Sequence, residues 1–331
     1  MKVLFVCSGN NNKIGIAPFI KQQGDSLIKS GVDVDYFPIV GRGVWGYLKA
    51  SGDLRNHLRK NKYDLIHAHF ALSGWAAVLA AGRIPVVLSL MGDDAYGVYI
   101  GVDVVRISSR IYTLLTWCIQ PFVKAIISKS QNIEKYVFLK SKSYIIPNGI
   151  DIGQFRPRPE INKSEHFSEN KRIVLFLGNK GEIRKNYPLV EAAVNMMNFP
   201  NVELVNPYPV KHADVPALLS VADVLAVPSL MEGSPNVVKE AMACNCPIVA
   251  TDIGDVKWVI GETQGCYVSS FNVHEFSAKL RLALQFAATT GRTDGKVRLI
   301  KLGLKEDCIA KRVIEVYNAV LNGRNILQVD C

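Results

Sequence analysis

The sequence predicts an α/β protein built from two doubly wound parallel-sheet halves, and three observations support that prediction. Short apolar runs rich in β-branched residues alternate with longer helical stretches in the first half, and the alternation starts again after residue 170. A Pro- and Gly-rich segment, residues 147–160, separates the two series and continues as a polar stretch to residue 171. Apolar strands alternating with helices are typical of parallel sheets covered on both faces. The segment between the series has the composition of a linker.

The pattern predicts each element in order. In the first half we expect strands at residues 2–7, 32–38, 63–67, 86–90, 125–128 and 144–146, and helices at 16–29, 47–60, 74–81, 104–118 and 133–139. In the second half we expect strands at 172–177, 202–205, 224–227, 247–250 and 266–268, and helices at 189–197, 215–220, 237–243 and 274–286. A last helix is expected at 307–321.

These elements predict an N-terminal domain over residues 1–155, a C-terminal domain over 156–310, and a C-terminal helix within 311–331 that packs back toward the N-terminal domain. Two doubly wound halves place a ligand cleft at the carboxyl ends of their strands.

Composition indicates a soluble cytoplasmic protein. The chain has 331 residues, 49% of them hydrophobic and 21% charged, which suits two globular cores. No apolar run is long enough to span a bilayer, and residues 1–7 are expected to form a buried strand rather than a signal peptide. Seven cysteines, an odd number in mostly apolar surroundings, favour reduced thiols over a disulfide framework.

The net charge of +10 is unevenly distributed. Residues 1–157 hold 19 Lys/Arg and 10 Asp/Glu, whereas residues 158–331 hold 20 and 19. The basic first half predicts an anionic partner, and solubility charge is the alternative. A basic, aromatic helical stretch at 104–117, with Arg106 and Arg110, favours a membrane surface, although a core-packed helix with two solvated arginines fits as well. No nucleic-acid-binding motif accompanies the charge, so nucleic acid is not expected.

The segment from Glu232 to Glu240 is the most informative motif. Two carboxylates bracket a Ser234–Pro235 turn that opens a helix. We expect Ser234 at the N-cap and Pro235 at the first helical position. A helix N-terminus offers backbone N–H groups and a positive dipole to a phosphate. An ordinary capped helix with two solvated glutamates is the alternative.

A second motif is the loop at residues 177–186, which follows the first strand of the second half. It carries Lys180, Arg184 and Lys185 beside glycines and could present cations to a diphosphate.

Together these motifs resemble glycosyltransferase family 4, whose members are retaining enzymes of the GT-B fold. Residues 228–254 are similar to the family's series of Pro-Ser, Glu-Gly, two glutamates eight positions apart and Glu-Ala-Met-Ala. Residues 147–151 with Phe155 and Pro157 resemble its interdomain segment, and residues 222–229 resemble the strand that enters the donor site.

The resemblance implies roles for matching positions. Glu240 would accept hydrogen bonds from a ribose, and Glu232 would contact the donor sugar or its pyrophosphate surroundings. Backbone groups near Asn236 and Val237 would hold the distal phosphate, and Arg184 and Lys185 would neutralise the leaving diphosphate. The predicted donor site is the set Arg184, Lys185, Glu232, Gly233, Ser234, Asn236, Val237 and Glu240. Catalytic roles are expected for Glu232, Lys185 and Asp94. No metal or other cofactor is expected, because cations and a helix end supply the positive charge.

The chain departs from the family pattern at three places. Asn179 stands where the family has an arginine, and Met91 stands where it has a histidine, with Asp94 matching the family's aspartate. Residues 202–209 are short where most members have two strands, so they do not identify the nucleotide.

Candidates on the acceptor side lie in the first half. The loop at residues 8–15, which ends in Gly15, borders the cleft in the family, and a plain strand-to-helix turn is the alternative. His67 ends the strand predicted at 63–67, and His69 follows it. Either histidine could contact the acceptor, and a structural role is the equally weighted alternative.

The sequence therefore predicts a retaining glycosyltransferase that moves a sugar from a nucleotide sugar to a saccharide or lipid-linked saccharide. Cell-surface polysaccharide synthesis at the inner face of the membrane is the expected setting. The alternatives are a nucleotide-sugar 2-epimerase and a saccharide-binding protein with impaired catalysis.

Overall fold

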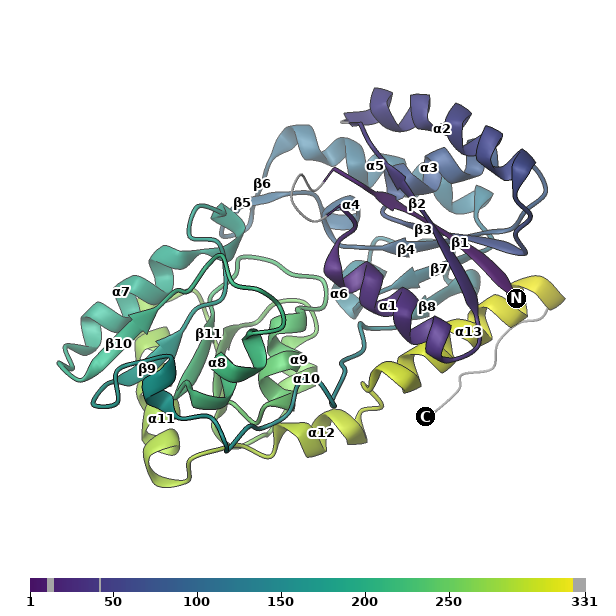
Figure 1. Cartoon of the computed structure of the whole chain (residues 1–331). Coiled ribbons are helices and arrows are strands. Elements are labelled where there is room, and N and C mark those ends of the chain that lie inside the picture. Colours follow the sequence, from purple (N-terminus) through teal and green to yellow (C-terminus); the bar gives the residue numbers. More distant parts are fainter. Residues whose placement is uncertain (11–14, 42, 324–331) are drawn as a thin grey trace. The chain divides into compact units, whose positions relative to one another are not determined.

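The computed structural model describes residues 1–10, 15–41 and 43–323, and it divides into two compact units. Unit 1 comprises residues 1–98, 106–149 and 306–331, and unit 2 comprises 99–105 and 150–305. Figure 1 shows that each unit is a sheet with helices around it. Each unit is described by itself below.

Unit 1 contains, within its described residues, a six-stranded sheet in which neighbouring strands are parallel, in the order β2-β1-β3-β4-β7-β8. Its central strands are buried along their whole length because helices cover both faces. The strands are β1 Lys2–Ser8, β2 Asp33–Ile39, β3 Leu65–His69, β4 Val86–Leu90, β7 Ala125–Ser128 and β8 Ser143–Ile145.

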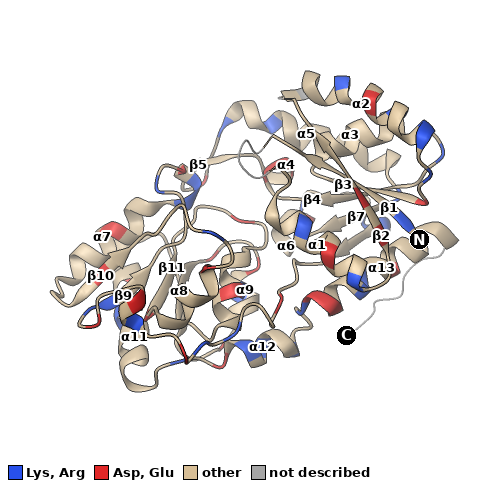
Figure 2. Cartoon of the chain, viewed as in Figure 1, with Lys and Arg blue, Asp and Glu red and all other residues tan. Residues whose placement is uncertain are grey.

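The helices of unit 1 include the long basic α2, along which Figure 2 shows Lys and Arg residues. The α-helices are α1 Pro18–Lys29, α2 Gly43–Lys60, α3 Ala71–Ala80, α4 Asp93–Tyr96, α5 Arg110–Ile119, α6 Gln131–Glu134 and α13 Glu306–Asn322. Short 3-10 helices occur at η1 Ile107–Ser109, η2 Gln120–Phe122 and η3 Lys140–Lys142.

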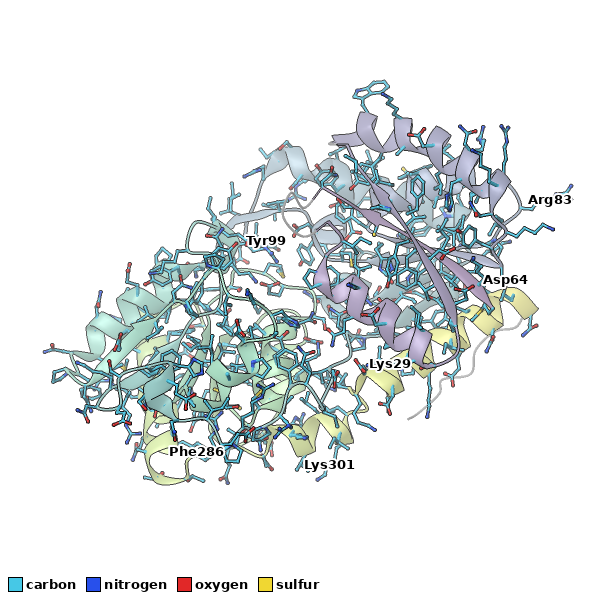
Figure 3. All side chains as sticks on the ribbon, viewed as in Figure 1. Lys29, Asp64, Arg83, Tyr99, Phe286 and Lys301 are labelled. Carbon is cyan, nitrogen blue, oxygen red and sulfur yellow. The ribbon has the colours of Figure 1, made fainter. Side chains whose placement is uncertain are left out.

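The last helix, α13, belongs to unit 1 although the chain has by then passed through unit 2. It packs beside α1, where Lys29, labelled in Figure 3, lies 2.7 Å from Glu306. On its buried face, Tyr317 is fully buried and hydrogen bonds with His67. The helix therefore completes the hydrophobic core of unit 1.

Unit 2 contains, within its described residues, a five-stranded sheet of parallel neighbours in the order β10-β9-β11-β12-β13. The strands are β9 Arg172–Leu175, β10 Val202–Val205, β11 Val224–Val227, β12 Ile248–Thr251 and β13 Cys266–Ser269. The helices are α7 Tyr187–Met197, α8 Val215–Val221, α9 Asn236–Ala243, α10 Val256–Ile260, α11 Val273–Thr289 and α12 Gly295–Lys301, with 3-10 helices η4 Lys163–Glu165 and η5 Ile183–Lys185.

A hairpin from the first half of the sequence also belongs to unit 2. Strands β5 Tyr99–Gly101 and β6 Val104–Val105 pair antiparallel, and β5 contacts η5. Figure 3 labels Tyr99 at this hairpin.

Several sequence predictions need correction. The helix expected over 104–118 begins only at Arg110, because Val104 and Val105 pair with β5 as a strand. In place of the helix expected over 133–139, the structure has the one-turn helix α6, Gln131–Glu134. The predicted boundary at residue 155 differs from the division between Gly149 and Ile150, and the last helix starts at Glu306 instead of 307.

Among the described residues, no helix combines the length and the apolar character needed to cross a bilayer.

Candidate active site

The turn between β11 and α9 differs in detail from its predicted form. Helix α9 begins at Asn236, and Pro235 occupies the N-cap position with an extended backbone, φ −68° and ψ 115°. The prediction of Ser234 as the N-cap is therefore wrong, since its hydroxyl points to other partners. No side chain caps the helix. The N-terminus of α9 remains the dipole end that a phosphate would approach.

The hydroxyl of Ser234 belongs to a buried ionic cluster beneath the turn. It donates to Asp255 Oδ2 at 2.7 Å, and Lys239 Nζ lies 3.0 Å from the same oxygen and also hydrogen bonds to Ser234 Oγ. The side chain of Lys239 is 1% exposed, so this ion pair is shielded from water. Breaking a buried ion pair leaves an uncompensated charge, which is costly. The pair therefore holds the segments that carry Ser234, Lys239 and Asp255 in one arrangement.

Gly254, the residue before Asp255, packs closely against the backbone of the turn. Its φ is +56°, and a Cβ built there would lie 2.6 Å from the carbonyl oxygen of Gly233 and 2.8 Å from that of Glu232. Only glycine fits this close approach without strain. The backbone at residues 232–233 is therefore packed directly against residue 254.

Glu232 binds two of the three cations of the basic loop, residues 177–186. Its Oε2 accepts from Arg184 Nη1 at 2.8 Å, and its Oε1 accepts from Lys185 Nζ at 2.7 Å. Arg184 also contacts Glu182 at 2.7 Å. These bonds join η5 to the turn before α9, so two segments almost 50 residues apart in sequence form one charged cluster.

The carboxyl group of Glu232 is ionised in this cluster. Burial on its own would raise its pKa, but the Lys185 and Arg184 cations outweigh that effect and lower the pKa below its ordinary value. With Glu182 included, the cluster holds two cations, Arg184 and Lys185, against two carboxylates.

A small pocket of about 60 Å³ lies where the basic loop faces the start of α9. Gly178 and Lys185 line one side, and Ser229 and Val237 line another. The pocket is far smaller than a nucleotide sugar, so it could seat only a small part of one, such as a phosphate group.

Glu240 has a partner that the sequence analysis missed. His212 Nε2 donates to Glu240 Oε1 at 2.9 Å, and the imidazole packs on the buried ring of Phe155 at 5.2 Å. The bond to Glu240 raises the pKa of His212 above its ordinary value, against the effect of burial. Glu240 lies three residues after Val237 in α9, on the same side of the helix as the pocket.

The residue at position 179 does not supply the cation that the family has there. Asn179 Oδ1 accepts from the backbone N–H of Gly181 at 2.9 Å, which stabilises the loop. The neighbouring Lys180 lies over the ring of Tyr187, 4.4 Å from its centroid.

Asp94 is fully buried in unit 1. It accepts backbone N–H bonds from Met91, Gly92 and Ala71, each at 2.9 Å. Burial raises its pKa to about 6 despite these bonds. Three backbone donors occupy both oxygens, which favours a role in holding the 91–94 turn and the start of α3.

The two histidines of β3 differ in environment. His67 hydrogen bonds with Tyr317 Oη at 2.5 Å and Ser89 Oγ at 2.7 Å, which favours a structural role over the predicted acceptor contact. His69 stacks on His67 at 4.3 Å, and its ring nitrogens have no hydrogen-bond partner among the described residues. Burial holds the pKa of His69 well below its ordinary value. Gly15 is exposed with φ +70°.

Within the part of the chain that the structure describes, no three His, Cys, Asp or Glu side chains are grouped so that they could hold a metal ion.

Comparison with known proteins shows which proteins the chain is similar to. The sequence model described as Glycosyltransferase Family 4 matches residues 3–154, and that described as Glycosyl transferases group 1 matches residues 160–285. TuaC of Bacillus subtilis, provisionally named a teichuronic acid biosynthesis glycosyltransferase, is 29% identical over 270 residues, covering 72% of this chain and 67% of its own.

A second relative is the UDP-Gal:alpha-D-GlcNAc-diphosphoundecaprenol alpha-1,3-galactosyltransferase of Escherichia coli. It is 23% identical over 324 residues, which cover 85% of this chain and 76% of the relative. Among solved structures, sucrose-phosphate synthase from Thermosynechococcus elongatus superposes with a TM-score of 0.82 at 17% identity, covering 98% of this chain and all of that one.

The two parallel-sheet units have the architecture of the GT-B fold, and both matching sequence models describe glycosyltransferases. The sequence models, which between them match residues 3–154 and 160–285, identify the family. The chain belongs to glycosyltransferase family 4, the group 1 glycosyl transferases.

Proposed function

We propose that the protein transfers a sugar, with retention at the anomeric carbon, from a nucleoside-diphosphate sugar to a saccharide or lipid-linked saccharide. The observation that carries the proposal is the pocket between Lys185 and Val237, with Glu240 farther along the same helix. Along α9, a seat for a phosphate comes first and an acceptor for ribose hydroxyls follows. This order matches the order of the groups in a nucleoside diphosphate.

The leaving diphosphate is the part of the reaction that this site serves best. Negative charge grows on it as the glycosidic bond to phosphate breaks. Lys185, Arg184 and the N-terminus of α9 are positioned in advance to stabilise that charge. Loss of one such donor typically lowers the rate on the order of 10²–10³.

Glu232 does not serve as a general acid in this proposal, because its carboxyl group is ionised. It fixes the positions of Arg184 and Lys185, and its negative charge favours the positive charge that develops at the anomeric carbon. Both of its oxygens are engaged by Arg184 and Lys185, so front-face departure and attack fits this site better than a covalent intermediate on Glu232.

The relatives support the acceptor class. One is named for teichuronic acid biosynthesis and another for transfer to a diphosphoundecaprenol-linked sugar. We infer that this chain builds a cell-surface polysaccharide or glycolipid, with unit 2 binding the donor and unit 1 the acceptor at the inner face of the membrane.

The first experiment titrates UDP, GDP and ADP against the wild-type protein, Glu240→Ala and Glu191→Ala by calorimetry. Glu191 is an exposed residue of α7 and serves as the matched control. We expect one nucleotide to bind, Glu240→Ala to weaken it by about tenfold or more, equal to ~1.4 kcal/mol, and Glu191→Ala to leave it unchanged. No nucleotide binding by the wild-type protein would sink the donor assignment.

The second experiment incubates the protein with nucleotide sugars, with and without saccharide acceptors. Transfer with the anomeric configuration preserved, read by NMR, supports the proposal. A changed sugar nucleotide formed without acceptor would assign an epimerase, and nucleotide binding with no turnover would assign a binding protein.

A further inference from the structure

An exposed apolar stripe runs along η1, α5 and η2 of unit 1. Its members are Ile107, Ile111, Leu114, Trp117 and Phe122, with relative exposures of 85%, 44%, 50%, 47% and 62%. Positions 107, 111, 114 and 117 are three or four residues apart, so they share one face of the helix. Soluble proteins seldom expose adjoining apolar side chains in this way unless the face binds something.

The opposite face of α5 is anchored in the fold. Thr116 and Ile119 are fully buried, and Thr116 Oγ1 donates to the backbone carbonyl of Asp94 at 2.6 Å. Trp75 Nε1 donates to the carbonyl of Leu115 at 3.0 Å. The stripe is therefore a fixed outer surface of unit 1, one helix width from the 91–94 turn.

The charge around the stripe identifies its partner. Residues 104–133 contain four Lys/Arg and no carboxylate, and Arg106, Arg110 and Lys124 are exposed. Figure 2 shows no acidic residue on the α5 ribbon. The helices packed against α5 are α3, which has no charged residue, and α4, which has the half-buried Asp93 and the buried Asp94. The surface is therefore apolar at its centre and cationic at its edge.

We propose that this stripe docks unit 1 on a bilayer of anionic lipids. An amphipathic helix with apolar and aromatic residues on one face and cations beside them lies in the plane of a membrane interface. Tryptophan is favoured at that depth, and basic side chains are attracted by anionic headgroups. The surface would hold the acceptor unit at the bilayer, which deepens the proposed function by favouring a lipid-linked acceptor.

The test is co-sedimentation of the full chain with phosphatidylcholine vesicles, with and without phosphatidylglycerol. The apolar variant is Leu114→Ser/Trp117→Ser. Its matched control is Leu282→Ser/Trp258→Ser in unit 2, where the same residue types are 44% and 45% exposed. The charge variant is Arg106→Gln/Arg110→Gln, matched by Lys257→Gln/Lys301→Gln, two exposed lysines of unit 2.

We expect wild-type protein to sediment with anionic vesicles and to be released by high salt. The apolar and charge variants should each lower the bound fraction by roughly tenfold or more, and both control variants should bind as wild type. Circular dichroism and nucleotide binding of each variant show that it is folded.

A label on Cys118 gives a direct reading. Cys118 is exposed, and a Cys308→Ser/Cys331→Ser background leaves Cys118 with only the four buried cysteines, Cys7, Cys244, Cys246 and Cys266. An environment-sensitive fluorophore at Cys118 should shift to the blue with anionic vesicles. Absence of vesicle binding, equal loss in the control variants, or a stripe that instead mediates self-association in sedimentation velocity would overturn the proposal. These readouts need neither donor nor turnover, so they are independent of the transferase proposal.

Discussion

His212 donates a hydrogen bond to Glu240 across 28 residues of sequence, with 2.9 Å between Nε2 and Oε1. Since this bond raises the pKa of His212, its contribution to stability is full below the ordinary histidine pKa and is lost as pH rises through the raised value.

His212→Ala should therefore destabilise the protein more at about pH 5.5 than at about pH 9. The difference should stay below ~1 kcal/mol, because the side chain is partly exposed. Urea unfolding at both pH values measures it. His212→Gln, which keeps a donor but does not titrate, should lose this pH dependence. An equal loss at both pH values for His212→Ala would contradict the ionic role of the bond.

Glu232→Gln should lower the transfer rate by roughly 10²–10³, because Arg184 and Lys185 lose the carboxylate that positions them. The lowered pKa of Glu232 means that its stabilising effect is present above the ordinary glutamate value and lost as pH falls through the lowered one.

A double-mutant cycle of Glu232→Gln with Lys185→Met should give a coupling free energy of about 0.5–3 kcal/mol in denaturant unfolding. Strict additivity would show that the two side chains do not interact in solution.

Lys239→Met should lower the free energy of unfolding by about 3–5 kcal/mol, because it leaves Asp255 buried without its cation. Combining it with Asp255→Leu should recover part of that loss. Arg156→Met is the control, since its exposed pair with Glu160 contributes about 0–1 kcal/mol. Similar losses from both substitutions would refute the importance of burial.

Gly254→Ala should destabilise the protein by about 1–3 kcal/mol, since it combines a left-handed backbone with a Cβ against the Gly233 carbonyl. Nucleotide affinity should fall with it, because residues 232–233 must move. The same substitution at Gly52, inside α2 with no atom near its Cβ, should stabilise by roughly 0.5–1 kcal/mol. Thermal unfolding and calorimetry check both, and a neutral effect at Gly254 would contradict the close contact.

Much of the fold could be predicted from local pattern. Strands β4, β7, β10 and β11 match their predicted ranges to the residue, because each is a short run of mostly apolar and β-branched residues. The stretch 104–118 was misassigned at its start. Val104 and Val105 form a strand only because β5 pairs with them, and their own sequence does not show this.

The site was predictable in its motifs and less so in its contacts. Glu232, Arg184 and Lys185 lie together in the structure, because their segments follow the neighbouring parallel strands β9 and β11. Ser234 was misread because its hydroxyl serves Lys239 and Asp255, and that buried pair depends on packing between α9 and the start of α10. His212 was missed since it lies in a loop 28 residues from Glu240, where no local pattern marks a partner.

The placement of the 99–105 hairpin and of α13 has a consequence for how the chain can be made and divided. The polypeptide passes between the units four times, after residues 98, 105, 149 and 305. A ribosome that has released the first 149 residues has not yet supplied the helix that buries His67 against Tyr317. Unit 1 is therefore finished only after α13 has been made, and no single cut in the chain yields two complete units.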